Sequence, residues 1–323
     1  MKIETGTIKT GDGAQIYFED HGTGEPVILL HGFTGSSANW APTIAEWRSR
    51  FRLIVPDLRG HGRSGILTTP FRHRDAAGDL LTLLDCLEIP ACKAVGISGG
   101  GNILLHMATM EPERMSAMVL VSATPWFPEQ ARTIMRQYKL TVTEQHREAL
   151  RRTHPAGDDQ IDALLDSAES FAASYGDMNL TPPHLGTIRA RTLIVQGDRD
   201  PLYPVDLSVE MAKAIPQASL WIVPDAGHGP VIGERWNEFL TNGRRISRQI
   251  IRREKPHLRA PVDAQRHWWR RSPLKIKPPQ RPPACTHFAD PQGGGCLYEA
   301  SSVVRFPDEP HRSDRPNRFQ CPG

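Results

Sequence analysis

The segment from residue 94 to 110 constrains the fold most, because a glycine-rich turn lies between an apolar run and a helix-like run. The turn has the pattern G-x-S-x-G, with Ser98 at its centre. A sharp strand-to-helix turn needs small neighbours, because the serine backbone is strained and the two arms of the chain nearly touch. Gly96, Gly99 and Gly100 provide that space. The pattern predicts a strand, an exposed Ser98 hydroxyl and a helix, although an idle serine in a glycine-rich turn would look the same.

The order of the other elements predicts the fold class. Residues 2–10 and 14–20 alternate apolar and polar side chains around a Gly-Asp-Gly turn, which is typical of a β-hairpin. Short apolar runs typical of buried strands lie at residues 26–30, 51–55, 94–97, 116–121, 191–196 and 219–223. Runs with helical spacing lie at residues 74–87, 103–110 and 205–215, and from about 230 onward. This alternation predicts an α/β fold with a mainly parallel sheet and helices on both faces.

An insertion interrupts the alternation between residues 125 and 185. Prolines break this segment, and the pieces between them are helical and amphipathic without strand character. We therefore expect a helical cap over residues 125–185. The core would consist of residues 1–124 and 186–242.

The last part of the chain has a different composition. Residues 241–323 contain 12 prolines and 14 arginines and carry a net charge of +10, whereas residues 1–240 carry −7. Such a segment cannot bury enough apolar surface to offset the entropy of ordering it, so we expect a poorly ordered basic tail over residues 243–323. Arginines flank Trp268 and Trp269, a combination that can bind single-stranded nucleic acid. No recognition module accompanies them, and nucleic acid is not expected as a partner.

Composition also limits the compartment and the partners. No run approaches ~18 apolar residues, so a membrane span is not expected, and the N-terminus lacks a secretory signal pattern. The five cysteines have the spacing of neither a disulfide framework nor a metal site, which favours the cytoplasm. The sequence has no phosphate-cradling loop, metal ligand set or dinucleotide fingerprint, so no cofactor is expected.

A serine hydroxyl becomes a good nucleophile when a base takes its proton and an acid orients that base. In open α/β sheets such groups lie on loops at the carboxyl ends of the strands. His228 is the best candidate for the base, because it follows a strand and its flanking glycines let the loop approach Ser98. Asp198 and Asp200 both follow the strand at 191–196, so either could be the acid. Weaker candidates for the base lie in a glycine-rich loop, an arginine-rich turn and a helix: His31, His61 and His106.

Two backbone N–H groups are candidates for stabilising the negative charge that develops on a substrate. Gly99 follows the nucleophile, and Phe33 lies in the loop after an earlier strand. Each such donor is typically worth about 10²–10³ in rate.

Five motifs together resemble those of the α/β-hydrolase superfamily over residues 10–240. They are His31-Gly32-Phe33-Thr34-Gly35, Asp57-Leu58-Arg59-Gly60-His61-Gly62-Arg63-Ser64, Gly96-Ile97-Ser98-Gly99-Gly100, Gly197-Asp198-Arg199-Asp200-Pro201 and Gly227-His228. The resemblance implies that the acid is the aspartate before the proline, Asp200, and that the turn at 57–64 is structural. Haloalkane dehalogenases and epoxide hydrolases carry aspartate as the nucleophile, so Ser98 argues against both. The sequence Ser-Gly-Gly-Gly after Ile97 departs from the more usual Ser-Met-Gly-Gly.

The resemblance implies a serine hydrolase that cleaves carboxylic esters of small or medium acyl chains. Other superfamily members that keep the serine are alternatives: lactonases, carbon–carbon bond hydrolases, aminopeptidases and cofactor-free haloperoxidases. A further alternative is a non-catalytic ligand-binding protein on the same fold. Aromatic and methionine side chains of the cap could line an apolar acyl pocket or form the cap's own core: Trp126, Phe127, Met135, Phe171, Tyr175 and Met178.

Overall fold

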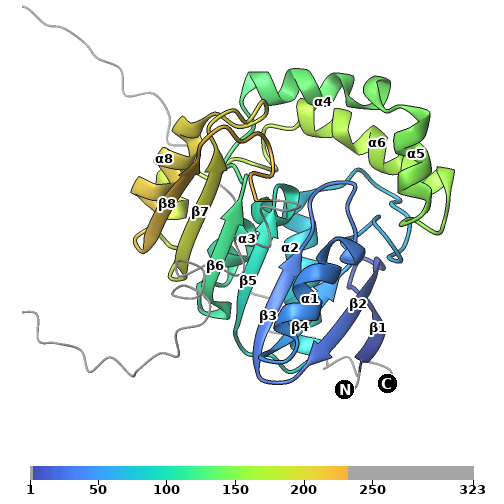
Figure 1. Ribbon diagram of the computed structural model, residues 1–323, viewed down its shortest axis with the longest axis horizontal. Helices are drawn as coiled ribbons and strands as arrows, with labels where there is room; N and C mark the ends of the chain where they lie inside the picture. The colour runs from blue at the N-terminus through green and yellow to red at the C-terminus, as the bar shows by residue number, and fades with distance from the viewer. Residues whose placement is uncertain (1–2, 232–323) are drawn as a thin grey trace, which may run out of the picture. The chain divides into compact units, whose positions relative to one another are not determined.

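The computed structural model describes residues 3–231, which form an eight-stranded sheet in the order β1-β2-β4-β3-β5-β6-β7-β8 (Figure 1). The strands are β1 (Ile3–Lys9), β2 (Gln15–Gly22), β3 (Glu25–Leu30), β4 (Phe51–Pro56), β5 (Cys92–Ile97), β6 (Met115–Val121), β7 (Arg191–Gly197) and β8 (Ala218–Val223). β2 is antiparallel to both β1 and β4, and the other neighbours are parallel. The predicted α/β fold is confirmed. The predicted tail and almost all of the helix predicted from about residue 230 lie outside the described residues.

Strands β3, β4, β5, β6 and β7 are buried on both faces, as their continuous apolar runs require. Along β3, Ile28 and Leu30 belong to one apolar core, and Val27 and Leu29 belong to the other. Because successive side chains of a strand point to opposite faces, the two cores lie on opposite sides of the sheet.

Helices cover both faces. Trp40 of the short 3-10 helix η1 (Ser37–Trp40) and Ile44 and Trp47 of α1 (Ala41–Trp47) pack into the core that contains Val27. The other core holds residues of α2 (His73–Cys86), α3 (Gly99–Met110) and α8 (Val205–Ala214). A second 3-10 turn, η2 (Pro112–Arg114), leads from α3 into β6. Figure 1 shows α1 in front of the sheet and α2 and α3 behind it.

The segment between β6 and β7 is helical. It contains α4 (Glu129–Thr141), α5 (Glu144–Arg151), α6 (Asp158–Ala173) and α7 (Pro182–Leu185), and its strand pairing is one isolated bridge between Trp126 and Asn179. Figure 1 shows α4, α5 and α6 over the end of the sheet where the parallel strands terminate. The division into a core and a separate cap remains a prediction.

Candidate active site

The turn at Ser98 joins the end of β5 to the start of α3 in a strained conformation. Ser98 has φ 52° and ψ −117°, in a region that residues with a side chain rarely adopt. The neighbouring chain lies very close, since a Cβ on Gly100 would be 2.5 Å from the carbonyl oxygen of Leu30 and 2.6 Å from that of His31. Tight backbone packing therefore holds the strained serine in place.

Replacing Gly100 with alanine is expected to lower the free energy of unfolding by about 3 kcal/mol or more, because backbone oxygens cannot move away from the added methyl group. Gly78 is the matched control, since it lies inside α2 and a Cβ there would have no atom within 4 Å. Gly78→Ala is expected to raise the free energy of unfolding by about 0.5–1 kcal/mol. Urea unfolding of both variants measures the difference, and equal stabilities would contradict the packing argument.

The structure brings Ser98, Asp200 and His228 together although they are far apart in sequence. His228 Nε2 lies 2.9 Å from Ser98 Oγ, and His228 Nδ1 lies 2.8 Å from Asp200 Oδ2. The Asp200 carboxylate can only accept, so Nδ1 carries the proton and Nε2 of the neutral ring faces the hydroxyl as an acceptor. This is the arrangement in which an imidazole takes a proton from a serine.

Asp200 is a buried carboxylate with a full set of donors. Its Oδ1 accepts the N–H groups of Leu202 at 2.8 Å and Tyr203 at 3.1 Å, and its Oδ2 also accepts Gln196 Nε2 at 2.8 Å. Burial alone would raise the pKa of Asp200, but the contact with His228 and these backbone donors lower it. The carboxylate therefore stays ionised and fixed beside the imidazole.

Asp198 points elsewhere. It is exposed, and its Oδ1 accepts the N–H of Ala226 at 3.2 Å. The loop that carries His228 is held on its other side by Ser122, whose Oγ accepts the N–H of Gly229 at 3.1 Å. These contacts position the loop and leave Asp200 as the aspartate that contacts His228.

The two candidate oxyanion donors lie side by side. A Cβ on Gly99 would be 3.4 Å from the Phe33 nitrogen, so the backbones of the two residues approach closely. Gly99 is the first residue of α3, where the N–H has no partner within the helix. Both N–H groups thus lie near Ser98, at the positive end of a helix dipole.

A cavity of about 210 Å³ opens on this site. Of the six candidate pocket residues, Phe127, Met135 and Phe171 line it, whereas Met178 is buried in an apolar core. The prediction was wrong for Trp126 and Tyr175. Trp126 is 39% exposed and pairs with Asn179, and Tyr175 is 68% exposed with its ring 3.9 Å from the Arg132 guanidinium carbon.

The cavity also has polar lining residues that the sequence reasoning missed. They come from four separate elements or loops: His73, Asn102, Tyr138 and Tyr203. The edge of the Tyr203 ring packs on His228 with the centroids 5.4 Å apart. Tyr203 lies three residues after Asp200, which is a signal that could have identified it, whereas no local pattern marks the other three.

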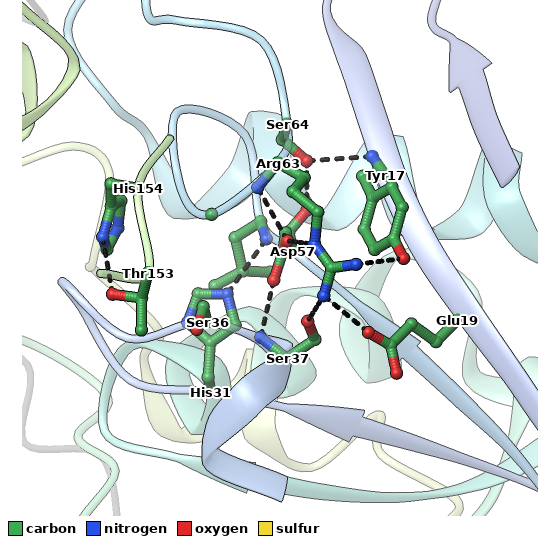
Figure 2. Close-up of polar contacts among 12 residues, drawn as sticks. Tyr17, Glu19, His31, Ser36, Ser37, Asp57, Arg63, Ser64, Thr153 and His154 are labelled. Carbon is green, nitrogen blue, oxygen red and sulfur yellow. Dashed lines mark hydrogen bonds and ion pairs between the residues drawn. The ribbon is translucent and has the colours of Figure 1, made fainter. Parts of the chain in front are cut away.

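The turn at 57–64 supports the loop that carries Phe33. Asp57 Oδ1 accepts the N–H of Ser37 at 2.6 Å, and its Oδ2 accepts that of Arg63 at 2.8 Å (Figure 2). Gln160 of α6 donates its Nε2 to the carbonyl oxygens of Gly60 at 3.0 Å and Gly62 at 2.9 Å. The contacts place the turn between the glycine-rich loop and the helical segment.

The three weaker histidine candidates are buried, and none of them lines the cavity at Ser98. His31 accepts the N–H of Leu58 at its Nε2, 3.1 Å away, so its Nδ1 donates to the Gly32 carbonyl oxygen. His61 Nδ1 contacts the carbonyl oxygen of Arg59 at 2.9 Å. Burial lowers the pKa of His106 to about 4.

Burial of imidazoles in this region predicts sensitivity to acid. Desolvation lowers the pKa of His31 to about 4 and also lowers the pKa of His61 and of His154, which lies beside Thr153 in Figure 2. The unfolded chain binds protons at these groups below pH ~6.5 and the folded chain does not, so stability is lost as the pH falls from about 6.5 toward 4. Urea unfolding at pH 7.5 and 5.0 is expected to differ by about 3 kcal/mol. The variant His61→Asn, which keeps a donor for Arg59, should reduce the difference, and a flat profile would contradict the assignment.

Within the described residues no group of three or more His, Cys, Asp or Glu side chains is arranged to hold a metal ion. In the same part of the chain no helix has both the length and the apolarity to cross a membrane.

Comparison with known proteins places the chain among hydrolases. A family model described as the α/β hydrolase fold matches residues 25–171, and one described as TAP-like protein matches residues 178–246. The chain is 27% identical over 251 residues to a pimeloyl-(acyl-carrier protein) methyl ester esterase of Nitrosomonas europaea, covering 68% of this chain and 94% of the esterase. It is 28% identical over 254 residues to a 2-hydroxy-6-oxononadienedioate/2-hydroxy-6-oxononatrienedioate hydrolase of Paraburkholderia xenovorans. The match covers 68% of this chain and 87% of that hydrolase. The structure of a malate-bound thermophilic esterase from Thermogutta terrifontis matches with a TM-score of 0.61 at 25% identity, over 77% of this chain and 99% of the esterase.

Proposed function

Because the chain belongs to the α/β-hydrolase superfamily, we propose that it is a serine hydrolase that cleaves carboxylic esters of small or medium acyl chains through an acyl-enzyme intermediate. The observation that carries the proposal is the pair of hydrogen bonds at His228: Nε2 accepts from Ser98 Oγ, and Nδ1 donates to Asp200 Oδ2. Residues 98, 200 and 228 also follow the nucleophile, acid, base order of this architecture.

In the first half of the reaction, Ser98 Oγ attacks the ester carbonyl carbon while His228 Nε2 takes the hydroxyl proton. The carbonyl oxygen becomes an oxyanion, which accepts hydrogen bonds from the N–H groups of Phe33 and Gly99. The ionised Asp200 stabilises the imidazolium that forms. When the intermediate collapses, His228 gives its proton to the alcohol oxygen, the alcohol leaves, and the acyl group remains on Ser98.

In the second half, water repeats the same steps. His228 takes a proton from a water molecule, the resulting hydroxide attacks the acyl carbonyl, and a second oxyanion forms between the same two N–H groups. Its collapse returns the proton from His228 to Ser98 Oγ and releases the carboxylic acid.

The cavity supports a substrate with a small or medium apolar acyl chain. Its volume is about 210 Å³, and aromatic and aliphatic side chains dominate its lining, among them Phe127, Met135 and Phe171. Apolar walls with a few placed polar groups are typical of small-molecule sites. The related esterase of Nitrosomonas europaea and the related hydrolase of Paraburkholderia xenovorans support hydrolytic chemistry in general, and the ester class is our narrower proposal.

The decisive experiment is rapid-mixing kinetics with p-nitrophenyl esters of acyl chains from acetate to laurate, together with lactones. We expect a burst of about one p-nitrophenol per chain with acetate or butyrate, which reports the acyl-enzyme, and a fall in kcat/KM for the longest chains. Folded protein that releases no p-nitrophenol from any of these esters would contradict the proposal. Preferential hydrolysis of lactones would assign the same serine chemistry to cyclic esters instead.

A further inference from the structure

A second histidine–aspartate pair lies in the wall of the cavity. His73, the first residue of α2, has its Nδ1 2.7 Å from Oδ2 of Asp177, in the loop after α6. The two side chains are 3% and 2% exposed, and His73 lines the cavity while Asp177 lies behind it. The proposed mechanism uses neither residue.

Asp177 fixes the orientation and the tautomer of the imidazole. Its carboxylate accepts the backbone N–H groups of His73 at 2.9 Å and Arg74 at 3.2 Å as well as the ring Nδ1. Burial alone would raise the pKa of Asp177, but these contacts with His73 and Arg74 lower it to about 2. An ionised carboxylate only accepts, so Nδ1 carries the proton, and in the neutral ring Nε2 is an acceptor with a free lone pair.

Nε2 of His73 faces the reacting centre through space that the glycine after the nucleophile leaves open. It lies 3.8 Å from the position that a Cβ on Gly99 would take, and the Phe33 nitrogen lies 3.4 Å from the same position. A longer side chain at residue 99, such as the methionine of the usual Ser-Met-Gly-Gly pattern, would project into this space. Within residues 3–231, Nε2 has no hydrogen-bond partner in the protein.

The position of His73 places it beside the acyl part of a bound ester. In the proposed mechanism the alcohol leaves next to His228, whereas His73 lies beside Gly99 and the oxyanion donors. The ring is surrounded by aromatic side chains, with centroids 5.0 Å from Phe171 and 5.7 Å from Phe127. No Lys, Arg, Asp or Glu side chain lines the cavity in the described part of the chain, which favours a neutral polar group over a charged one as its partner.

We propose that His73 is a specificity-determining residue that accepts a hydrogen bond from a hydroxyl group on the acyl chain of the substrate, with Asp177 as its positioning residue. The preferred substrates are then esters of hydroxy acids. The inference rests on the proposed function and narrows it. An acceptor that stays buried and unpaired with an unsubstituted acyl chain costs free energy, and the substrate hydroxyl removes that cost.

The test compares kcat/KM for ethyl 3-hydroxybutyrate and ethyl 3-methoxybutyrate, with 2-hydroxybutyrate and 2-methoxybutyrate as the second pair. A methoxy group resembles the hydroxyl in position but cannot donate. The native protein is expected to prefer a hydroxy ester over its methoxy partner by about tenfold. His73→Phe keeps a flat aromatic ring but removes the acceptor. In this variant the ratio of kcat/KM for the hydroxy ester to that for its methoxy partner is expected to fall to about the ratio of their rates of uncatalysed hydrolysis.

Asp177→Ala gives an independent readout. Oδ2 of Asp177 accepts both the backbone N–H and the ring Nδ1 of His73, and alanine removes this acceptor. Neither the tautomer nor the orientation of the ring is then fixed, so the hydroxyl preference should fall to about that of His73→Phe. A role of Asp177 in stability alone would lower the melting temperature and leave the ratio unchanged.

Three outcomes would overturn the inference. One is a hydroxy-to-methoxy ratio of kcat/KM near unity in the native protein. This measurement does not depend on whether any variant folds. The second is a preference that persists in His73→Phe. The third is that the protein hydrolyses neither these four esters nor ethyl butyrate, which would contradict the proposed function as well. If ethyl butyrate is hydrolysed and the ratio is near unity, the inference alone fails.

Discussion

Replacing Ser98 with alanine is expected to lower kcat for p-nitrophenyl butyrate by about 10⁵–10⁶-fold. The substitution removes the Oγ atom that lies 2.9 Å from His228 Nε2, so no acyl-enzyme can form. What activity remains would come from the oxyanion donors and His228 acting on water directly. Steady-state assays measure this effect, with enough protein to detect rates near that of the uncatalysed reaction. The p-nitrophenol burst should also be lost.

Ser116→Ala is the matched control for this substitution. Ser116 lies near the start of β6, at the opposite end of the parallel strands from Ser98, and its Oγ donates to the carbonyl oxygen of Cys92. We expect its kcat to stay within about twofold of the native value, since surface-like changes away from the site act mainly on stability. A Ser98→Ala protein that folds normally and keeps more than a few per cent of the activity would exclude the serine mechanism.

Changing Asp200 to asparagine is expected to lower kcat by about 10⁴-fold. The asparagine oxygen would take the two N–H groups of Leu202 and Tyr203, so its amide nitrogen would point toward His228. The ring must then accept at Nδ1 and carry its proton on Nε2, where it cannot take a proton from Ser98. The effect should appear in kcat at every pH at which the protein is folded.

Asp198→Asn tests whether this loss is specific to one aspartate. Asparagine keeps the oxygen that accepts the Ala226 N–H, so the loop before His228 should stay in place and kcat should change by less than about threefold. A large loss in Asp198→Asn with a small one in Asp200→Asn would reverse the assignment of the acid. Melting temperatures of both variants distinguish a lost fold from a lost proton relay.

The sequence predicted those parts of the site that depend on local chain geometry. The turn at Ser98 needs glycines on both sides, and the loops of Asp200 and His228 each follow a strand of a parallel sheet, so all three residues had to lie at one edge. The sheet itself was predictable for the same reason, since each buried strand is a short apolar run between helical segments.

Tertiary contacts determine which side chains line the cavity, and the sequence did not predict these contacts. Trp126 and Tyr175 have the composition of pocket residues, but the direction of a side chain in a helical segment with many prolines does not follow from its type, and both are exposed. Conversely, His73 and Asp177 are 104 residues apart, and neither belongs to a motif. No local periodicity indicates that the loop after α6 returns to the start of α2.

Gln160 gives the helical segment a constraint of its own. Its buried amide donates to the carbonyl oxygens of Gly60 and Gly62, and the turn that contains them holds the N–H of Ser37 through Asp57. A chimaera that receives this segment from another hydrolase without an equivalent amide would leave two buried carbonyl groups without their donor. A helical segment that is transferred to change selectivity therefore has to carry an amide equivalent to Gln160. Without that amide, the turn at 57–64 and the loop that it supports beside Ser98 would lose their position.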